Sequence, residues 1–167
     1  WSTAVGGNSL AHGNGAIAVG GQASTFASIQ THGNIAIGSS SGVVGGSFGG
    51  TLTTANGGNA VAIGTATQAT GASSFAAGAN AQASQTDAVA IGNGALTSGF
   101  YSASVGGVSR ATNTSSSAFG FNAWATGVGA TSIGSATRAT GTDAGALGYD
   151  AQATADGASS IGAFSGA

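Results

Sequence analysis

The chain has 167 residues, a net charge of −2 and a charged fraction of only 4%, against about a quarter in an ordinary globular protein. So little positive charge excludes a nucleic-acid surface built on phosphate neutralisation, and the absence of cysteine excludes disulfides and thiolate metal sites within the chain. Although there are 33 glycines, 41% of the residues are apolar, which favours an ordered fold over a disordered one.

The sequence contains neither a recognisable targeting signal nor a membrane helix. Its first residues, WSTAVGGNSL, lack the basic start and apolar stretch of a signal peptide. No apolar run approaches the roughly 18 residues that a membrane helix needs. We therefore expect the chain to be a piece of a longer protein.

A short phrase that ends in glycine recurs along the chain. It reads AVAIG at 60–64 and at 88–92, with looser copies at 16–20, 102–106 and 116–120. The closing glycines are spaced by 14 residues in two runs, which are Gly6 and Gly20, then Gly64, Gly78, Gly92, Gly106, Gly120, Gly134, Gly148 and Gly162. Gly38 belongs to the series but is out of phase. Fixed spacing of this kind identifies a repeat array.

Each phrase has the pattern of a short strand. The residue before the glycine is a sizeable apolar residue in ten of eleven repeats, and the residue two before it is always Ala or Ser. Alternating large and small side chains have the period of two that is typical of a strand. A second strand is predicted half a period later, around Ala69, Ala83, Thr97, Ala111, Ala125, Ala139 and Ala153.

Fourteen residues per rung predict a flattened parallel β-roll with two sheets, because a three-sided solenoid needs about 18 residues. One or two aliphatic side chains per rung bury little apolar area against the ordering entropy. We therefore expect self-association into a closed symmetric assembly, through an outward face formed by the Ala/Ser column. Periodicity leaves open whether this is a dimer or a trimer, and whether the large apolar column lines the roll or the subunit interface.

The stretch GNAVAIGTATQATGASSFAAG at 58–78 resembles the head repeat of YadA-like trimeric autotransporter adhesins. That repeat centres on a phrase close to Asn-Ser-Val-Ala-Ile-Gly, here NAVAIG at 59–64. The resemblance implies an all-β, left-handed parallel β-roll assembled as a homotrimer. It also implies display on a bacterial outer membrane through C-terminal parts absent from this chain, and binding of host cells or of matrix proteins such as collagen, fibronectin or laminin.

The whole chain, 1–167, is predicted to be a single head domain with an insertion at about 39–58 that breaks the phase. Such a loop on a regular scaffold is either a ligand-binding loop or a tolerated surface excursion. A smaller excess of four residues lies around TFASIQTHG at 25–33.

Long side chains recur four residues after the glycines, at Gln68, Gln82, Leu96, Arg110, Trp124, Arg138 and Gln152. Arg110, Trp124 and Arg138 fall on successive rungs, about 4.8 Å apart, where cation–π contacts can form. Because arginine and aromatic residues are favoured anchors for partners, the predicted ligand contacts are these three residues with Phe121 and Tyr149, and with Asn59, Val61 and Ile63 of the NAVAIG phrase. The other interpretation is a ladder that merely covers the roll.

The large apolar column is predicted to pack either in the core or at the trimer interface. Its members are Ile37, Ile63, Ile91, Val105, Phe119, Ile133, Leu147 and Ile161.

No catalytic, cofactor or metal site is predicted. The matches to Gly-x-Ser-x-Gly at 38–42 and 45–49 lack the strand–helix setting and the His/acid pair of that motif. His12 and His32, both in an HGN phrase, are interpreted as turn residues. The alternative function is an ice-binding β-solenoid, which requires a threonine column that persists over successive rungs, and we expect none here. A solenoid enzyme would need a cluster of acids and bases that the chain does not supply.

Overall fold

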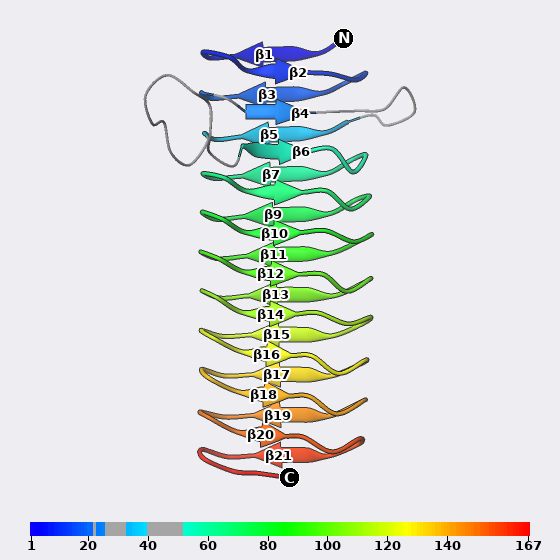
Figure 1. Ribbon diagram of the computed structural model, residues 1–167, viewed down its shortest axis with the longest axis vertical. Helices are drawn as coiled ribbons and strands as arrows, with labels where there is room; N and C mark the ends of the chain where they lie inside the picture. Colours follow the sequence, from blue (N-terminus) through cyan, green and yellow to red (C-terminus); the bar gives the residue numbers. More distant parts are fainter. Residues whose placement is uncertain (22, 26–32, 40–51) are drawn as a thin grey trace.

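The chain winds into two parallel β-sheets that face each other along a rod, with the termini at opposite ends (Figure 1). The computed structural model describes residues 1–21, 23–25, 33–39 and 52–167, and of 23–25 only the backbone. These residues contain no helix, and so none that is long and apolar enough to cross a membrane.

One sheet holds the odd-numbered strands and the other the even-numbered strands. The eleven strands of the first sheet are β1 (Thr3–Val5), β3 (Ile17–Val19), β5 (Ile35–Ile37), β7 (Val61–Ile63), β9 (Phe75–Ala77), β11 (Val89–Ile91), β13 (Ala103–Val105), β15 (Ser117–Phe119), β17 (Thr131–Ile133), β19 (Gly145–Leu147) and β21 (Ser159–Ile161). The ten strands of the second are β2 (Leu10–Ala11), β4 (Ala23–Thr25), β6 (Thr53–Ala55), β8 (Gln68–Ala69), β10 (Gln82–Ala83), β12 (Leu96–Thr97), β14 (Arg110–Ala111), β16 (Trp124–Ala125), β18 (Arg138–Ala139) and β20 (Gln152–Ala153).

Parallel pairing keeps the repeats in register along the rod. Val89 in β11 pairs with Phe75 in β9 and with Ala103 in β13, at the corresponding position of each neighbouring repeat. Ile37 in β5 pairs with Val19 and Ile63 in the same way, although its repeat is out of phase in the sequence. The prediction of a two-sheet parallel roll with two strands per repeat is therefore confirmed.

The predicted insertion at 39–58 lies partly outside the described residues, at 40–51. Its last part contains β6, which pairs with β4 on one side and β8 on the other. The chain has therefore rejoined the regular sheet before the NAVAIG phrase begins. Most of the excess around 25–33 also falls outside the described residues, at 26–32.

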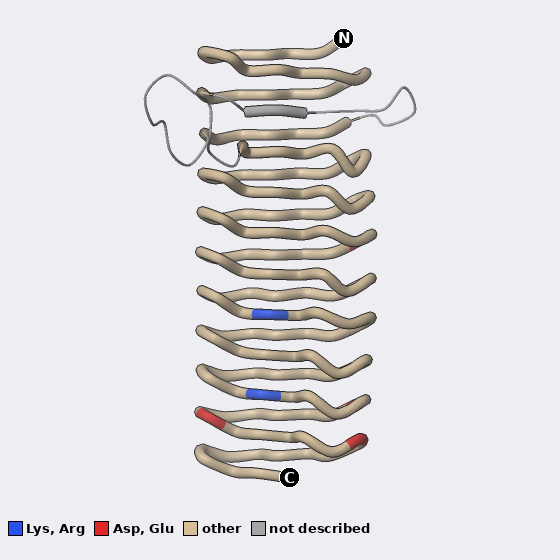
Figure 2. The backbone as a smooth tube through the Cα atoms, in the orientation of Figure 1, with Lys and Arg blue, Asp and Glu red and all other residues tan. Residues whose placement is uncertain are grey.

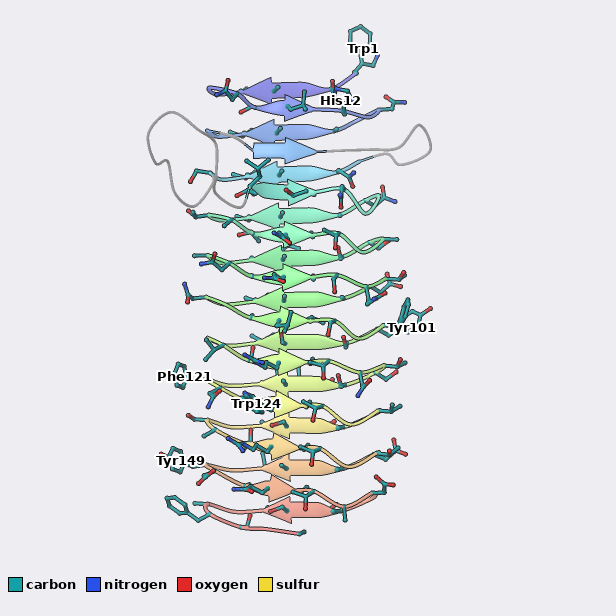
Figure 3. The ribbon with its side chains drawn as sticks, viewed as in Figure 1. Trp1, His12, Tyr101, Phe121, Trp124 and Tyr149 are labelled. Carbon is teal, nitrogen blue, oxygen red and sulfur yellow. The ribbon has the colours of Figure 1, made fainter. Side chains whose placement is uncertain are left out.

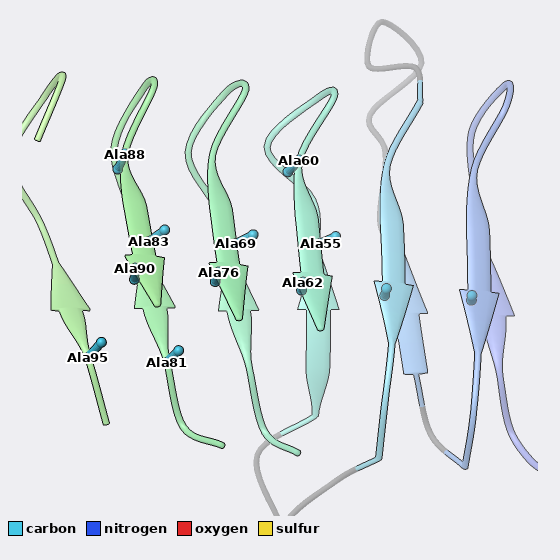
Figure 4. Close-up of a cluster of buried hydrophobic side chains, with 12 residues drawn as sticks. Ala55, Ala60, Ala62, Ala69, Ala76, Ala81, Ala83, Ala88, Ala90 and Ala95 are labelled. Carbon is cyan, nitrogen blue, oxygen red and sulfur yellow. The ribbon is translucent and has the colours of Figure 1, made fainter. Parts of the chain in front are cut away.

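The interior of the roll is filled by alanine (Figure 4). Ala62, Ala76 and Ala90, each two residues before a closing glycine, are 0% exposed in a single chain. The second layer comes from alanines of the even-numbered strands, such as Ala69 and Ala83. The prediction that the Ala/Ser column faces outward is therefore wrong. This column lines the core, because the two sheets lie so close that only small side chains fit between them.

The serines of this inner column each find a hydroxyl partner. The oxygens of Ser104 and Thr97 lie 2.6 Å apart, and Ser132 donates to Thr137 over 2.7 Å. Ser160 is 2.8 Å from Ser165 in the same manner. Pairing satisfies polar groups that would otherwise be costly to bury, so serine replaces alanine here without an unpaired hydroxyl.

Glycine closes each phrase because the corner requires it. Gly92 has a φ of +129°, a backbone conformation that side chains exclude. A Cβ atom built on Gly92 would lie 2.5 Å from the carbonyl oxygen of Gly106 in the next rung. Backbone conformation and close stacking thus both demand glycine at this point in the repeat.

Candidate functional site

Arg110, Trp124 and Arg138 form a stack on the outer face of the even-numbered sheet, which we call the Arg–Trp–Arg ladder. They begin the successive strands β14, β16 and β18, whose pairing aligns them. The guanidinium carbon of Arg110 lies 5.2 Å from the centre of the Trp124 ring, and that of Arg138 lies 4.7 Å from it. The two arginines are exposed and the indole between them is half-buried. The predicted cation–π ladder is present.

The indole is held by a second contact. Its Nε1 donates a hydrogen bond of 2.9 Å to Oδ1 of Asn122, in the turn that precedes β16. Asn122 itself has a φ of +55°, in the left-handed region that asparagine tolerates better than most residues. Turn geometry, hydrogen bond and flanking guanidiniums together fix the orientation of the Trp124 ring.

Positive and negative charges are separated on the roll. Arg110 and Arg138 are the two Lys or Arg residues of the chain, and Figure 2 shows them on the middle of one face. The four acidic residues all lie in the corner turns, at Asp87, Asp143, Asp150 and Asp156. No ion pair to either guanidinium occurs among the described residues, so the positive charge of the ladder is not neutralised within the chain.

A column of hydroxyl side chains runs beside the ladder, two residues further along each even-numbered strand segment. Its members are Thr70, Ser84, Ser98, Thr112, Thr126, Thr140 and Thr154, all exposed or half-buried. Threonine thus persists over four successive rungs at the C-terminal end, and our expectation that no such column exists is wrong. The column is visible in the sequence, because the sixth residue after each closing glycine from Gly64 to Gly148 is Thr or Ser.

Exposed aromatic side chains gather along one edge of the roll, and we call Phe121, Tyr149 and Phe164 the aromatic edge. Figure 3 shows Phe121 and Tyr149 projecting from the same edge. The rings of Tyr149 and Phe164 meet edge to face, with their centres 5.2 Å apart. Phe164 was not among the predicted contacts, although it follows the closing glycine Gly162 by two residues in the same kind of corner.

Predicted ligand contacts from the NAVAIG phrase lie elsewhere. Asn59 is an exposed turn residue with a φ of +53°. Val61 and Ile63 project from β7 on the outer face of the odd-numbered sheet, on the opposite side of the roll from the ladder. The structure therefore brings the three ladder residues together. It places the other predicted ligand contacts elsewhere, on the opposite face of the roll or in its corner turns.

Large apolar side chains form a line on the outer face of the odd-numbered sheet, interrupted by Ala77 between Ile63 and Ile91, which we call the apolar stripe. Ile91 is 38% exposed and Ile133 is 41% exposed, with their side chains directed away from the roll interior. The stripe consists of Ile37, Ile63, Ile91, Val105, Phe119, Ile133, Leu147 and Ile161. In a single chain these residues lie outside the core, so the column does not line the roll, and its place at a subunit interface stays a prediction.

The stripe borders a shallow hollow near the C-terminal end. A cavity of about 150 Å³ is lined by Ile133, Leu147 and Ile161 together with the small residues Thr131, Gly145, Ala146 and Ser159. Thr131, Gly145 and Ser159 follow from the sequence, because the position three residues before each closing glycine holds Phe75 and Val89 and then small residues from Ala103 onward. Small residues beside large ones give this face a relief into which another side chain can insert.

The described residues contain no group of three or more His, Cys, Asp or Glu side chains placed to hold a metal ion. His12 is exposed and directly follows β2, while His32 lies outside the described residues. The GGSFG match at 45–49 and most of the GSSSG match at 38–42 also lie outside them. The described surfaces thus offer aromatic, guanidinium, hydroxyl and aliphatic groups.

Comparison with known families identifies the repeat. The family model described as the YadA head domain repeat matches residues 2–23, 50–67, 55–81, 69–95, 98–123, 111–137, 125–144 and 139–165. A comparison with curated proteins gave no significant match. The matched segments follow the 14-residue repeat through most of the rod. The chain therefore belongs to the YadA head family, a family of adhesin modules.

Proposed function

We propose that the chain is the head of a trimeric surface adhesin that binds host matrix proteins through many weak contacts. Family membership over most of the chain supports an adhesin role rather than an enzymatic one. The proposal includes a left-handed winding of the roll, a homotrimer, and anchoring in a bacterial outer membrane through parts of the protein outside this chain.

The observation that carries the trimer is the apolar stripe. A core made of alanine and small polar side chains buries little apolar area per residue, while the largest aliphatic side chains lie on one outer face. An exposed apolar surface of this kind marks an interaction site, and symmetric association of identical chains covers it in every copy. The stripe is thus proposed as the trimer interface.

The proposed ligand is a matrix protein such as collagen, fibronectin or laminin. The aromatic edge offers three aromatic side chains, of which Tyr149 is of a type favoured as an anchor, and the Arg–Trp–Arg ladder lies on the face beside it. Three chains would present three copies of each surface, so weak individual contacts would add up to high avidity. Asn59, Val61 and Ile63 remain predicted contacts of secondary rank, because the last two belong to the face proposed for self-association.

Molar mass in solution is the first test. We expect light scattering on this chain to give three times the mass of 15.3 kDa that one chain has. A folded species with the mass of one chain would contradict the trimer and, with it, the role of the stripe.

Binding to immobilised collagen, fibronectin and laminin, with albumin as the control surface, tests the ligand. Because charge is nearly absent from the chain, we expect matrix-protein binding to change by less than about twofold between roughly 0.05 M and 0.3 M salt. Steep loss of binding over this range would contradict a contact based on aromatic groups, and absence of binding to all three proteins would contradict the proposed ligand class.

The threonine column favours one second candidate, an ice-binding solenoid. Thr112, Thr126, Thr140 and Thr154 are regularly spaced, but the adjacent outward column carries long side chains that interrupt a flat array. The adhesin proposal predicts no thermal hysteresis at millimolar protein, and measurable hysteresis would favour the alternative.

A further inference from the structure

We propose that the Arg–Trp–Arg ladder is a binding site for a linear acidic glycan that carries an anionic group on every disaccharide. The inference goes beyond matrix-protein binding and would hold whether or not the chain binds such a protein. It starts from charge. A chain with 4% charged residues keeps both of its Lys or Arg residues in one column, two rungs apart, with no carboxylate on the same face.

The guanidiniums are fixed but not neutralised. Both contact the same indole ring, at 5.2 and 4.7 Å from its centre, and that ring is itself hydrogen-bonded to Asn122. Each guanidinium carbon therefore lies over the Trp124 ring, and the two guanidiniums still carry N–H donors for a ligand. Arginine in this state suits bidentate recognition of a carboxylate or sulfate.

The spacing of the charges selects an extended ligand. Two rungs separate Arg110 from Arg138, which places them about 10 Å apart along the rod, roughly the length of one disaccharide in an extended glycan. A single small anion cannot reach both. A chain laid along the rod axis would meet one guanidinium with each successive anionic group.

The neighbouring column supplies partners for the uncharged part of such a ligand. Thr112, Thr126 and Thr140 lie two residues beyond the ladder residues, on the same outward side of the sheet. Hydroxyl groups both donate and accept hydrogen bonds, which matches the hydroxyls of a sugar. This face also lies on the opposite side of the roll from the apolar stripe, so it would stay exposed in an assembly formed through the stripe.

The test uses Trp124 as the reporter. In a Trp1→Phe background it is the remaining tryptophan, and Trp1 lies beyond the first rung (Figure 3). We expect chondroitin sulfate and hyaluronan hexasaccharides to change its fluorescence saturably at about 0.05 M salt and to lose affinity as salt rises. Response to both supports recognition of carboxylate, and response to chondroitin sulfate alone supports recognition of sulfate.

Two variants locate the site. Arg110→Gln/Arg138→Gln places in the column a residue that it already carries at Gln82 and Gln152, so the fold is retained, and we expect about a tenfold or greater loss of affinity by calorimetry. Arg110→Gln/Gln68→Arg keeps the net charge but moves one guanidinium five rungs from the other. It should weaken binding to a similar degree.

Four results would overturn the proposal. These are no binding of either acidic glycan to the wild-type ladder, equal binding by the neutral hexamer of N-acetylglucosamine, equal binding by sulfate ion alone, and undiminished binding by either variant. A hexasaccharide spans the ladder of a single chain, so a monomeric protein, or one that binds no matrix protein, would contradict the proposed function while leaving this result intact.

Discussion

Replacing Gly92 with alanine is expected to lower the free energy of unfolding by more than about 3 kcal/mol. The added methyl group is unfavourable for two reasons, the backbone conformation at this residue and a steric clash with the next rung. The φ of +129° is closed to alanine, and the new Cβ would lie 2.5 Å from the Gly106 carbonyl oxygen. Relief of the contact requires the two rungs to separate, which weakens the parallel pairing between β11 and β13.

Gly145→Ala is the matched control for this experiment. Gly145 lies in β19 without a positive φ, and a Cβ there would meet nothing within 4 Å. Ala103 already occupies the corresponding position of β13, so we expect a change within about 1 kcal/mol. Both variants should be unfolded by denaturant at the same protein concentration, because assembly contributes to stability. Equal effects of the two substitutions would show that the corner does not require glycine.

The 14-residue period and the strands were predictable because the same residue pattern occurs in each repeat. A glycine every 14 residues fixes the corner, and large–small alternation before it fixes the strand. Register followed too, since parallel stacking of identical rungs leaves Val61 opposite Phe75 and Ile63 opposite Ala77. The repeat that ends at the out-of-phase Gly38 was also predictable as a strand, because the residues before Gly38 have the same alternation of large and small side chains.

Which face of the strand points inward was not predictable from alternation alone. The usual rule puts large apolar residues inside, and our sequence analysis put the small column outside. In the roll the opposite holds, because tight corners keep the two sheets close enough for Ala90 but not for Ile91. The inner serines gave no single signal either, because Ser104 pairs with Thr97, seven residues before it, whereas Ser132 pairs with Thr137, five residues after it.

The ladder was predictable from its column, since arginine and tryptophan stand out among small side chains. The contacts that hold these side chains in place were not predictable, because they depend on the geometry of the turns. Asn122 reaches the Trp124 Nε1 atom only through a left-handed turn residue. Phe164 likewise meets Tyr149 only because successive corners stack, although the two residues occupy different positions in their repeats.

Replacing Ile91 and Ile133 with glutamine is expected to dissociate the assembly without unwinding the individual β-strands. Both side chains belong to the apolar stripe, and in a trimer the double variant would place six amides against apolar surface. Burial of an unpaired amide costs about 1–3 kcal/mol in proteins. We therefore expect the concentration at half-dissociation, measured by light scattering or sedimentation, to rise by more than about a hundredfold.

Leu96→Gln is the control for surface polarity, compared with Ile91→Gln alone. Leu96 lies in β12 on the outer face of the other sheet, where the same column already carries Gln82. Both substitutions exchange an aliphatic side chain for an amide, and they differ in the face that receives it. Only the substitution at Ile91 should change the mass, and equal behaviour of the two would place the interface elsewhere.

Thermal unfolding should reveal how far the fold depends on this interface. Since the interior holds only alanine and small polar groups, each rung gains little apolar burial on its own. The part of its large side chains that stays exposed in a single chain, 38% for Ile91 and 41% for Ile133, becomes buried only on association. The wild-type melting temperature should rise with protein concentration, and that of Ile91→Gln/Ile133→Gln should be lower at every concentration. A melting temperature independent of concentration in both proteins would mean that the alanine core is sufficient, and that the stripe serves a partner other than a second copy of the chain.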